Sequence, residues 1–170
     1  MDIESYITWI VKYYLPAMIA NASPLLVKGD KVIDRGRLFI DGKPILGSHK
    51  TWEGFAIGVI NSYLTGSAIG MAFRDPYIQL LSVVAGVSSM LGDLVGAFIK
   101  RRLGLKPGRP LPIVDQLNFA LMTTLSYLLL GVVDVISRPD YVLLTLALIF
   151  ILHVATNNIA YILGVKETRW

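Results

Sequence analysis

The sequence predicts an all-α integral membrane protein that crosses the bilayer with about five helices. Of its 170 residues, 54% are hydrophobic and only 16% are charged. A soluble domain of this length carries about 25% charged residues. The charged residues also cluster, and the long uncharged stretches between them suit a surface that faces lipid. The length fits a single domain that covers residues 1–170.

Five apolar segments are long enough to cross a hydrocarbon core, which takes about 20 residues. We expect the spans near residues 3–21, 52–73, 77–99, 113–136 and 141–164. Two longer polar loops, 22–51 and 100–112, remain between them. In the first loop, alternating residues around the Asp41-Gly42 pair predict a short β-hairpin.

Positive charge is distributed unevenly between the two ends of these spans. Thirteen of the sixteen Lys and Arg residues lie in the two long loops and the C-terminal tail. The positive-inside rule therefore places both loops and the C-terminus in the cytoplasm and the N-terminus outside. We expect a multi-pass protein of the cell membrane.

Asp93 is the clearest functional candidate because it lies inside the third span. A charge within a span costs at least about a few kcal/mol, so an intramembrane carboxylate usually has a function. Asp93 precedes Lys100 by seven residues, which places it about 10 Å deep at the rise of an α-helix. Small and polar residues recur on the same helix face, which alternatively indicates a helix-packing stripe. That alternative explains the glycines and serines but not the aspartate.

Asp115 begins the fourth span on the same side of the membrane, with Asn118 one turn later. Taken alone, Asp115 fits a functional carboxylate and a simple partner of the helix dipole equally well. Together with Asp93 it favours Mg²⁺, which binds through one or two carboxylates plus substrate phosphates. One or two such ions, with Mn²⁺ as a substitute, could stabilise a displacement at phosphorus. The chain has no cysteine and no histidine cluster, so we do not expect His49 or His153 to bind metal.

The basic residues beside these carboxylates are predicted to bind phosphates. Glycines make the second loop flexible enough to wrap several phosphates with Lys100, Arg101, Arg102, Lys106 and Arg109. Lys50 and Thr51 lead into the second span, whose helix N-terminus itself favours an anion. Glu53, in the first turn, either complements the helix dipole or pairs with Lys50, or it contacts metal or nucleotide.

Several of these residues stand in motifs that resemble the CDP-diacylglycerol synthase family. The segment 48–54 resembles its S-x-K-T-x-E-G element. Gly92-Asp93, the run from Lys100-Arg101 to Lys106, and Pro112-x2-Asp115-x2-Asn118 resemble its C-terminal signature, which has a K-R-x4-K core and ends D-R-x-D. The compact length and the segment 15–24 are most similar to the archaeal branch of that family, the CDP-archaeol synthases.

The chain also departs from the family pattern. The K-D pair of the family is Lys106-Pro107 here, the H-G-G motif is absent, and the final Asp is Asn118. A carboxylate role is therefore not expected at position 118, where Asn118 is instead a candidate nucleotide contact.

The resemblance implies cytidylyl transfer from CTP to an unsaturated archaetidic acid (2,3-di-O-geranylgeranylglyceryl phosphate), which gives CDP-archaeol and pyrophosphate. It implies a catalytic set of Asp93, Asp115 and Lys50, with the two carboxylates holding Mg²⁺. The lipid phosphate, with polyprenyl ether tails, would enter sideways from the bilayer. Asn21 and Ser23 are candidates for reading cytosine, because the first two spans end near the basic loops.

A small transporter or ion channel with Asp93 on its pathway is the alternative function. That alternative predicts polar residues on both sides of the bilayer midplane, whereas Asp134 is the only carboxylate in the outer half of the spans. A membrane scaffold would leave Asp93 unexplained. The expected partners are CTP, the lipid phosphate and membrane lipid, with no nucleic acid, and the sequence leaves a homodimer open.

Overall fold

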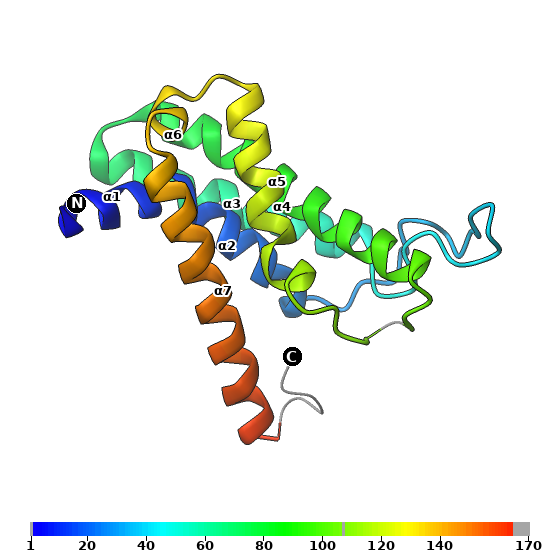
Figure 1. Ribbon diagram of the computed structural model, residues 1–170. Coiled ribbons are helices and arrows are strands. Elements are labelled where there is room, and N and C mark those ends of the chain that lie inside the picture. Colours follow the sequence, from blue (N-terminus) through cyan, green and yellow to red (C-terminus); the bar gives the residue numbers. More distant parts are fainter. Residues whose placement is uncertain (1, 107, 165–170) are drawn as a thin grey trace.

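The computed structural model describes residues 2–106 and 108–164, and within them the chain is mostly helical (Figure 1). In chain order the helices are α1 (Ile3–Tyr13), α2 (Leu15–Ala22), the 3-10 helix η1 (Ser23–Leu26), α3 (Trp52–Phe73), α4 (Pro76–Arg102), α5 (Val114–Leu129), α6 (Val133–Ile136) and α7 (Pro139–Ile162). The helical class predicted from the sequence is confirmed. Lys166 and Arg169, which contributed to the predicted topology, lie outside the described residues.

Three helices, α3, α4 and α7, are long and apolar enough to cross a membrane. The first predicted span is instead divided into α1 and α2 at Tyr14, because Pro16 lacks the N–H that would continue the helical hydrogen bonds. The fourth is divided into α5 and α6 by a turn at Gly131, whose φ of +70° suits glycine. The structure corrects these two segments to pairs of shorter helices, and the number of membrane crossings stays a prediction.

Small residues allow α3 and α4 to pack closely. A Cβ atom at Gly66 would lie 2.0 Å from the Cβ of Ser82, and one at Gly86 would lie 2.7 Å from the Cβ of Ser62. The Ser62 hydroxyl donates a hydrogen bond of 2.7 Å to the backbone oxygen of Ser82. The small residues of the third predicted span therefore do form a packing face, and Asp93 lies on the same helix.

An aromatic cluster fills the core of the bundle. Its buried members are Tyr6, Trp9, Tyr13, Tyr14, Tyr127 and Tyr141. Trp9 donates to the backbone oxygen of Asp134 over 2.9 Å, and the Tyr13 hydroxyl donates to the Asp134 carboxylate. Asp134, the carboxylate of the outer half, thus has structural partners in this cluster.

The loop between η1 and α3 is organised by the buried carboxylate of Asp34. Its oxygens accept backbone hydrogen bonds of 2.9 Å from Gly36, 2.8 Å from Leu46 and 2.9 Å from Gly47. Burial acts to raise the pKa of Asp34, but these donors outweigh it, so the pKa lies below its usual value. One side chain therefore fixes the two arms of the loop to each other.

The predicted β-hairpin in this loop is only partly formed. The chain reverses at Asp41-Gly42, where Gly42 has a φ of +73°, and Leu38 and Pro44 form an isolated antiparallel bridge. No strand occurs in the part of the chain that the structure describes. Pro44 has no N–H to extend the ladder. Ile45 still donates to the backbone oxygen of Arg37 over 3.1 Å, but the next two N–H groups, of Leu46 and Gly47, donate to Asp34. The predicted turn is correct, and the predicted strands are wrong.

Replacing Asp34 by asparagine should loosen this loop, because an amide offers one acceptor oxygen in place of two. The folded-state pKa of Asp34 is depressed below the unfolded value of about 3.9. Its stabilisation is therefore present above about pH 4 and is lost as the pH falls through the folded pKa. Hydrogen exchange at the Leu46 and Gly47 amides, corrected for intrinsic rates, should show this protection in the wild type and much less in Asp34→Asn. Equal protection in both proteins at neutral pH would contradict the assignment.

Candidate active site

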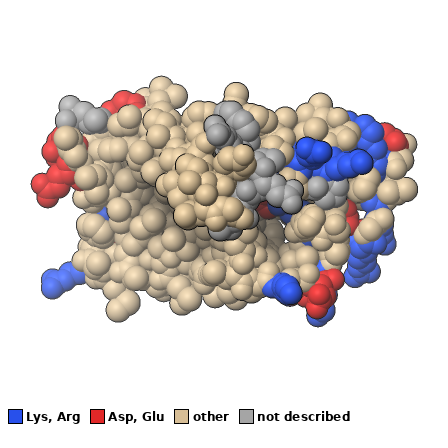
Figure 2. Space-filling model, turned by 90° about the horizontal axis from the view of Figure 1, so that it is seen from below, with Lys and Arg blue, Asp and Glu red and all other residues tan. Residues whose placement is uncertain are grey.

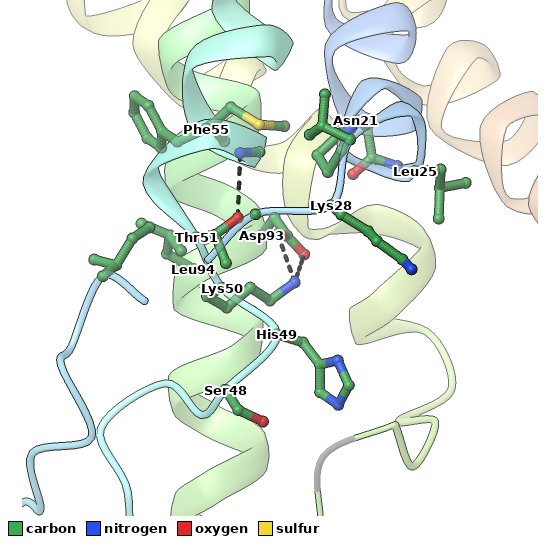
Figure 3. Close-up of a pocket in the computed structure, with 16 residues that line it drawn as sticks. Asn21, Leu25, Lys28, Ser48, His49, Lys50, Thr51, Phe55, Asp93 and Leu94 are labelled. Carbon is green, nitrogen blue, oxygen red and sulfur yellow. Dashed lines mark hydrogen bonds and ion pairs between the residues drawn. The ribbon is translucent and has the colours of Figure 1, made fainter. Parts of the chain in front are cut away.

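Two adjoining cavities lie at the end of the bundle that carries the basic loops. The larger, of about 470 Å³, is bounded by α2, η1, the first loop, α3 and α4 (Figure 3). The smaller, of about 190 Å³, lies between the same loop, the end of α4 and the start of α5. His49, Lys50 and Asp93 line both cavities. Figure 2 shows that most Lys and Arg residues on the visible face gather at one end of the molecule.

An ion pair between Lys50 and Asp93 stands where the two cavities meet. The Lys50 ammonium donates to both carboxylate oxygens, over 2.7 and 2.6 Å (Figure 3). Lys50 comes from the loop just before α3, and Asp93 comes from the middle of α4. Both side chains are partly exposed, at 26% and 30%. The predicted pair of catalytic groups is therefore brought together in a position that solutes can reach.

A second pair, between Lys100 and Asp115, repeats this arrangement in the smaller cavity. The Lys100 ammonium lies 3.1 and 2.9 Å from the two Asp115 oxygens. The backbone N–H of Leu111 donates to the same carboxylate over 2.8 Å, which fixes its orientation at the start of α5. Both predicted carboxylates therefore line the smaller cavity, and each has a lysine partner.

Arg101 lines the same small cavity and is only 5% exposed. One guanidinium nitrogen donates to the backbone oxygen of Lys106 over 3.3 Å. The Nε and the other terminal nitrogen have no hydrogen-bond partner among the described residues. A buried cation with unpaired donors is costly. An anion bound in the cavity would satisfy them.

Thr51 forms the N-terminal cap of α3 and faces the larger cavity. Its hydroxyl accepts from the backbone N–H of Gly54 over 3.2 Å. The first loop passes so close that a Cβ atom at Gly29 would lie 2.1 Å from the Thr51 hydroxyl. The helix N-terminus therefore directs its partial positive charge toward this cavity.

Glu53 lies in the first turn of α3, where a carboxylate complements the helix dipole, and it does not pair with Lys50, whose ammonium contacts Asp93. Its carboxylate accepts from the backbone N–H of Lys31 over 3.2 Å, and it lines neither of these cavities. The contact holds the first loop against the start of α3. Glu53 thus supports the loop that carries Lys50.

Arg102 points away from the two cavities. It donates to the Asp41 carboxylate and to the backbone oxygen of Pro44. Its guanidinium lies over the Phe39 and Phe98 rings, 4.7 and 4.8 Å from their centroids. Arg102 therefore fastens the turn of the first loop to the end of α4 and is not among the residues that line the two cavities.

Two other predicted phosphate ligands, Lys106 and Arg109, are exposed in the second loop and line neither of these cavities. Asn118 packs instead between helices, because a Cβ atom at Gly96 of α4 would lie 2.3 Å from its side-chain nitrogen. None of these three residues lines the two cavities.

The two candidates for reading cytosine have different positions. Asn21 lines the larger cavity. Ser23 is buried, donates to the backbone oxygen of Ile19 over 2.6 Å and accepts from Asn61 over 3.0 Å. The structure therefore places Asn21 at the site and gives Ser23 a structural contact.

Three polar residues that line the larger cavity, Lys28, Ser48 and His49, were not among the predicted site residues. His49 was considered only as a metal ligand, and Lys28 only as a contribution to topology. Their positions in the sequence could have identified them, because His49 directly precedes Lys50 and Lys28 lies in the same loop.

The donor set suits a cation that shares its ligands with a substrate. No group of three or more His, Cys, Asp or Glu side chains that could hold a metal occurs among residues 2–106 and 108–164. Asp93 and Asp115 offer hard carboxylate oxygens, which fit Mg²⁺ if phosphate oxygens and waters complete its coordination.

Comparison with known proteins gives consistent matches along nearly the whole chain. The family described as "CarS-like: CDP-archaeol synthase" matches residues 3–170. The CDP-archaeol synthase of Staphylothermus marinus is 52% identical over 165 residues, which are 97% of this chain and 94% of that protein. The CDP-archaeol synthase of Sulfurisphaera tokodaii is 40% identical over 171 residues, with 100% of both chains covered.

A solved structure described as "Structural insight into an intramembrane enzyme for archaeal membrane lipids biosynthesis" has a similar fold. The TM-score is 0.80 at 33% sequence identity, and the match covers 92% of this chain and 94% of that one.

Proposed function

The chain belongs to the CDP-archaeol synthase family, and we propose on that premise that it uses CTP to activate an unsaturated archaetidic acid. Membership makes the chain a membrane-embedded cytidylyltransferase of archaeal lipid biosynthesis. The proposed substrate is 2,3-di-O-geranylgeranylglyceryl phosphate, and the products are CDP-archaeol and pyrophosphate. The observation that carries this proposal is the pair of adjoining cavities that meet at Lys50 and Asp93. An enzyme of this family accounts for Asp93 better than the transporter alternative.

The smaller cavity suits the triphosphate of CTP. It brings together three cations, Lys50, Lys100 and Arg101, and Arg101 has unpaired donors there. Guanidinium and ammonium groups bind phosphate oxygens strongly in a partly desolvated site. The larger cavity would then receive the cytidine and the lipid headgroup, with Asn21 as the candidate that reads the base.

The lipid phosphate needs no general base. Phosphate monoesters have a second pKa of about 6, so the phosphate is already a dianion near neutral pH. One of its oxygens attacks the α-phosphorus of CTP and forms a new P–O bond. The bond from that phosphorus to the bridging oxygen of the β-phosphate breaks, and pyrophosphate leaves with the electron pair. Lys50, Lys100 and Arg101 would offset the charge of the leaving group.

Asp93 and Asp115 would hold Mg²⁺, as one or two ions with Mn²⁺ as a substitute. When bound, the metal supplies charge stabilisation at the phosphate oxygens. Each carboxylate contacts a lysine ammonium, so each lysine would release its carboxylate to make room for a metal. The phosphates of CTP offer those lysines new partners. This exchange leaves no charge without a partner in the partly buried site.

We further propose that the site opens to the cytoplasm. The residues of both cavities lie at the end of the bundle where the basic loops gather (Figure 2). The positive-inside rule assigns such loops to the cytoplasmic side. CTP would then reach the site from water, and the lipid would reach it from the bilayer.

The proposed reaction is tested with purified protein, labelled CTP and a panel of lipid phosphates. We expect a CDP-linked lipid and pyrophosphate in equal amounts, with the highest rate for polyprenyl ether-linked phosphates. CTP or dCTP should be strongly preferred over ATP and GTP, because a site built to pair with one base leaves polar groups unpaired with another. Comparable rates with ATP, or no reaction with any lipid phosphate, would contradict the proposal.

Asp93→Asn should lower the turnover rate by about a hundredfold or more, because it removes a charge that acts on the reacting phosphates. Asp134→Asn is the matched control, since Asp134 is also hydrogen-bonded but packs in the aromatic cluster. Initial rates are compared after thermal unfolding shows that both variants are folded. Wild-type turnover in Asp93→Asn would overturn its assignment as a catalytic residue.

A further inference from the structure

The turn of the first loop exposes an apolar segment, Leu38-Phe39-Ile40, which we name the loop tip. Ile40 is 94% exposed and Leu38 is 62% exposed. Full burial of one such side chain is worth about 1.5 to 3 kcal/mol. The segment lies outside the site described above, since none of its residues lines either cavity. An apolar tip in a polar loop therefore suggests a partner that covers it.

The loop tip is held in one place at the end of α4. Arg102 donates to Asp41 and to the backbone of Pro44, and its guanidinium contacts both Phe39 and Phe98. The Phe39 and Phe98 rings meet edge to face, with centroids 5.3 Å apart. Figure 1 shows the first loop projecting beyond this end of α4.

The tip continues the exposed apolar side of α4. Leu91, Val95 and Ile99 are exposed at four-residue spacing, so they form one stripe along the helix. In a helix that crosses a membrane, such a stripe faces lipid. Phe98 follows Val95 by three residues and Leu91 by seven, so it lies on the same face of the helix, and Phe39 packs on it. The loop tip is therefore joined to the lipid-facing side of the helix.

Helix length places this junction at the surface of the bilayer. With 27 residues, α4 is about 40 Å long, whereas the hydrocarbon core is about 30 Å thick. About 10 Å of helix therefore extends into the headgroup regions. Arg102 and the loop tip lie at the basic end of α4. We assign the extra length to this end, because it keeps the charged side chains there out of the hydrocarbon.

The charges around the tip favour an anionic surface. Arg35 and Arg37 are exposed, and neither has a carboxylate within ion-pair distance in the described ranges 2–106 and 108–164. The nearby acids are already engaged, Asp34 by backbone N–H groups and Asp41 by Arg102. The tip thus combines exposed apolar side chains with free positive charge.

We infer that the loop tip docks onto the headgroup region of the membrane that the chain spans, with Leu38 and Ile40 inserted and Arg35 and Arg37 beside anionic lipid phosphates. Apolar insertion combined with basic residues is the usual physical basis of binding at a membrane surface. Docking would hold the first loop at two points, by Lys50 at the site and by the tip at the bilayer. The inference stands apart from the proposed reaction, because it needs only the membrane.

The test uses a single fluorescent label at the tip. The chain contains no cysteine, so Ile40→Cys accepts an environment-sensitive dye at one position. The labelled protein is placed in nanodiscs of zwitterionic lipid alone or with anionic phospholipid. We expect blue-shifted emission and quenching by lipids that carry a nitroxide at the top of the acyl chain. Removing Arg35 and Arg37 together, as glutamines, should lower the ratio of docked to free tip by about fivefold per arginine in the anionic discs.

Asp30→Cys is the matched control, because Asp30 is exposed in the same loop but ten residues from Ile40. A dye there should keep the emission of a water-exposed label. Water-like emission at position 40 in both kinds of nanodisc would overturn the inference. Blue-shifted emission without quenching by lipid would also overturn it, since the tip would then be covered by protein, such as a second copy of the chain.

Discussion

The ion pair between Lys50 and Asp93 is the contact on which the arrangement of the site depends. It joins the loop that Asp34 organises to α4, and it forms a wall shared by both cavities. A carboxylate within a membrane span is costly without a partner, and the ammonium of Lys50 supplies one. In the proposed mechanism, the contact that stabilises the carboxylate in the fold is therefore also the contact that substrate and metal would rearrange. Stability and function involve the same charges here.

The carboxylates and lysines of the site could be predicted from the sequence, because so apolar a chain contains few charged side chains and they stand out at a few positions. Asp93, Asp115, Lys50 and Lys100 do lie together, and they line the same small cavity. Arg102 shows the limit of that reasoning. It follows Arg101 directly, but the next position on a helix points about 100° away. Its partners belong to a loop about sixty residues earlier in the chain, and no local pattern gives that contact.

The fold, too, could be predicted only in part from the sequence. Hydropathy identified the apolar segments. Because it is an average over many residues, it did not show the helix breaks at Tyr14 and Gly131. Pro16 and Gly131 are visible in the sequence, and they decide where the helices end. Alternation around Asp41 correctly gave the turn. The strands failed because the carboxylate of Asp34 competes for the backbone donors that a ladder would use.

We propose that Lys50 and a metal ion compete for the carboxylate of Asp93. The most direct measurement is the affinity for Mn²⁺, without nucleotide, of the wild type and of Lys50→Met, by electron paramagnetic resonance. Methionine keeps the length of the side chain but removes the ammonium, so an unpaired carboxylate faces the cavity. We expect Lys50→Met to bind Mn²⁺ more tightly than the wild type, by about tenfold or more. Equal or weaker binding by a folded Lys50→Met protein would contradict it.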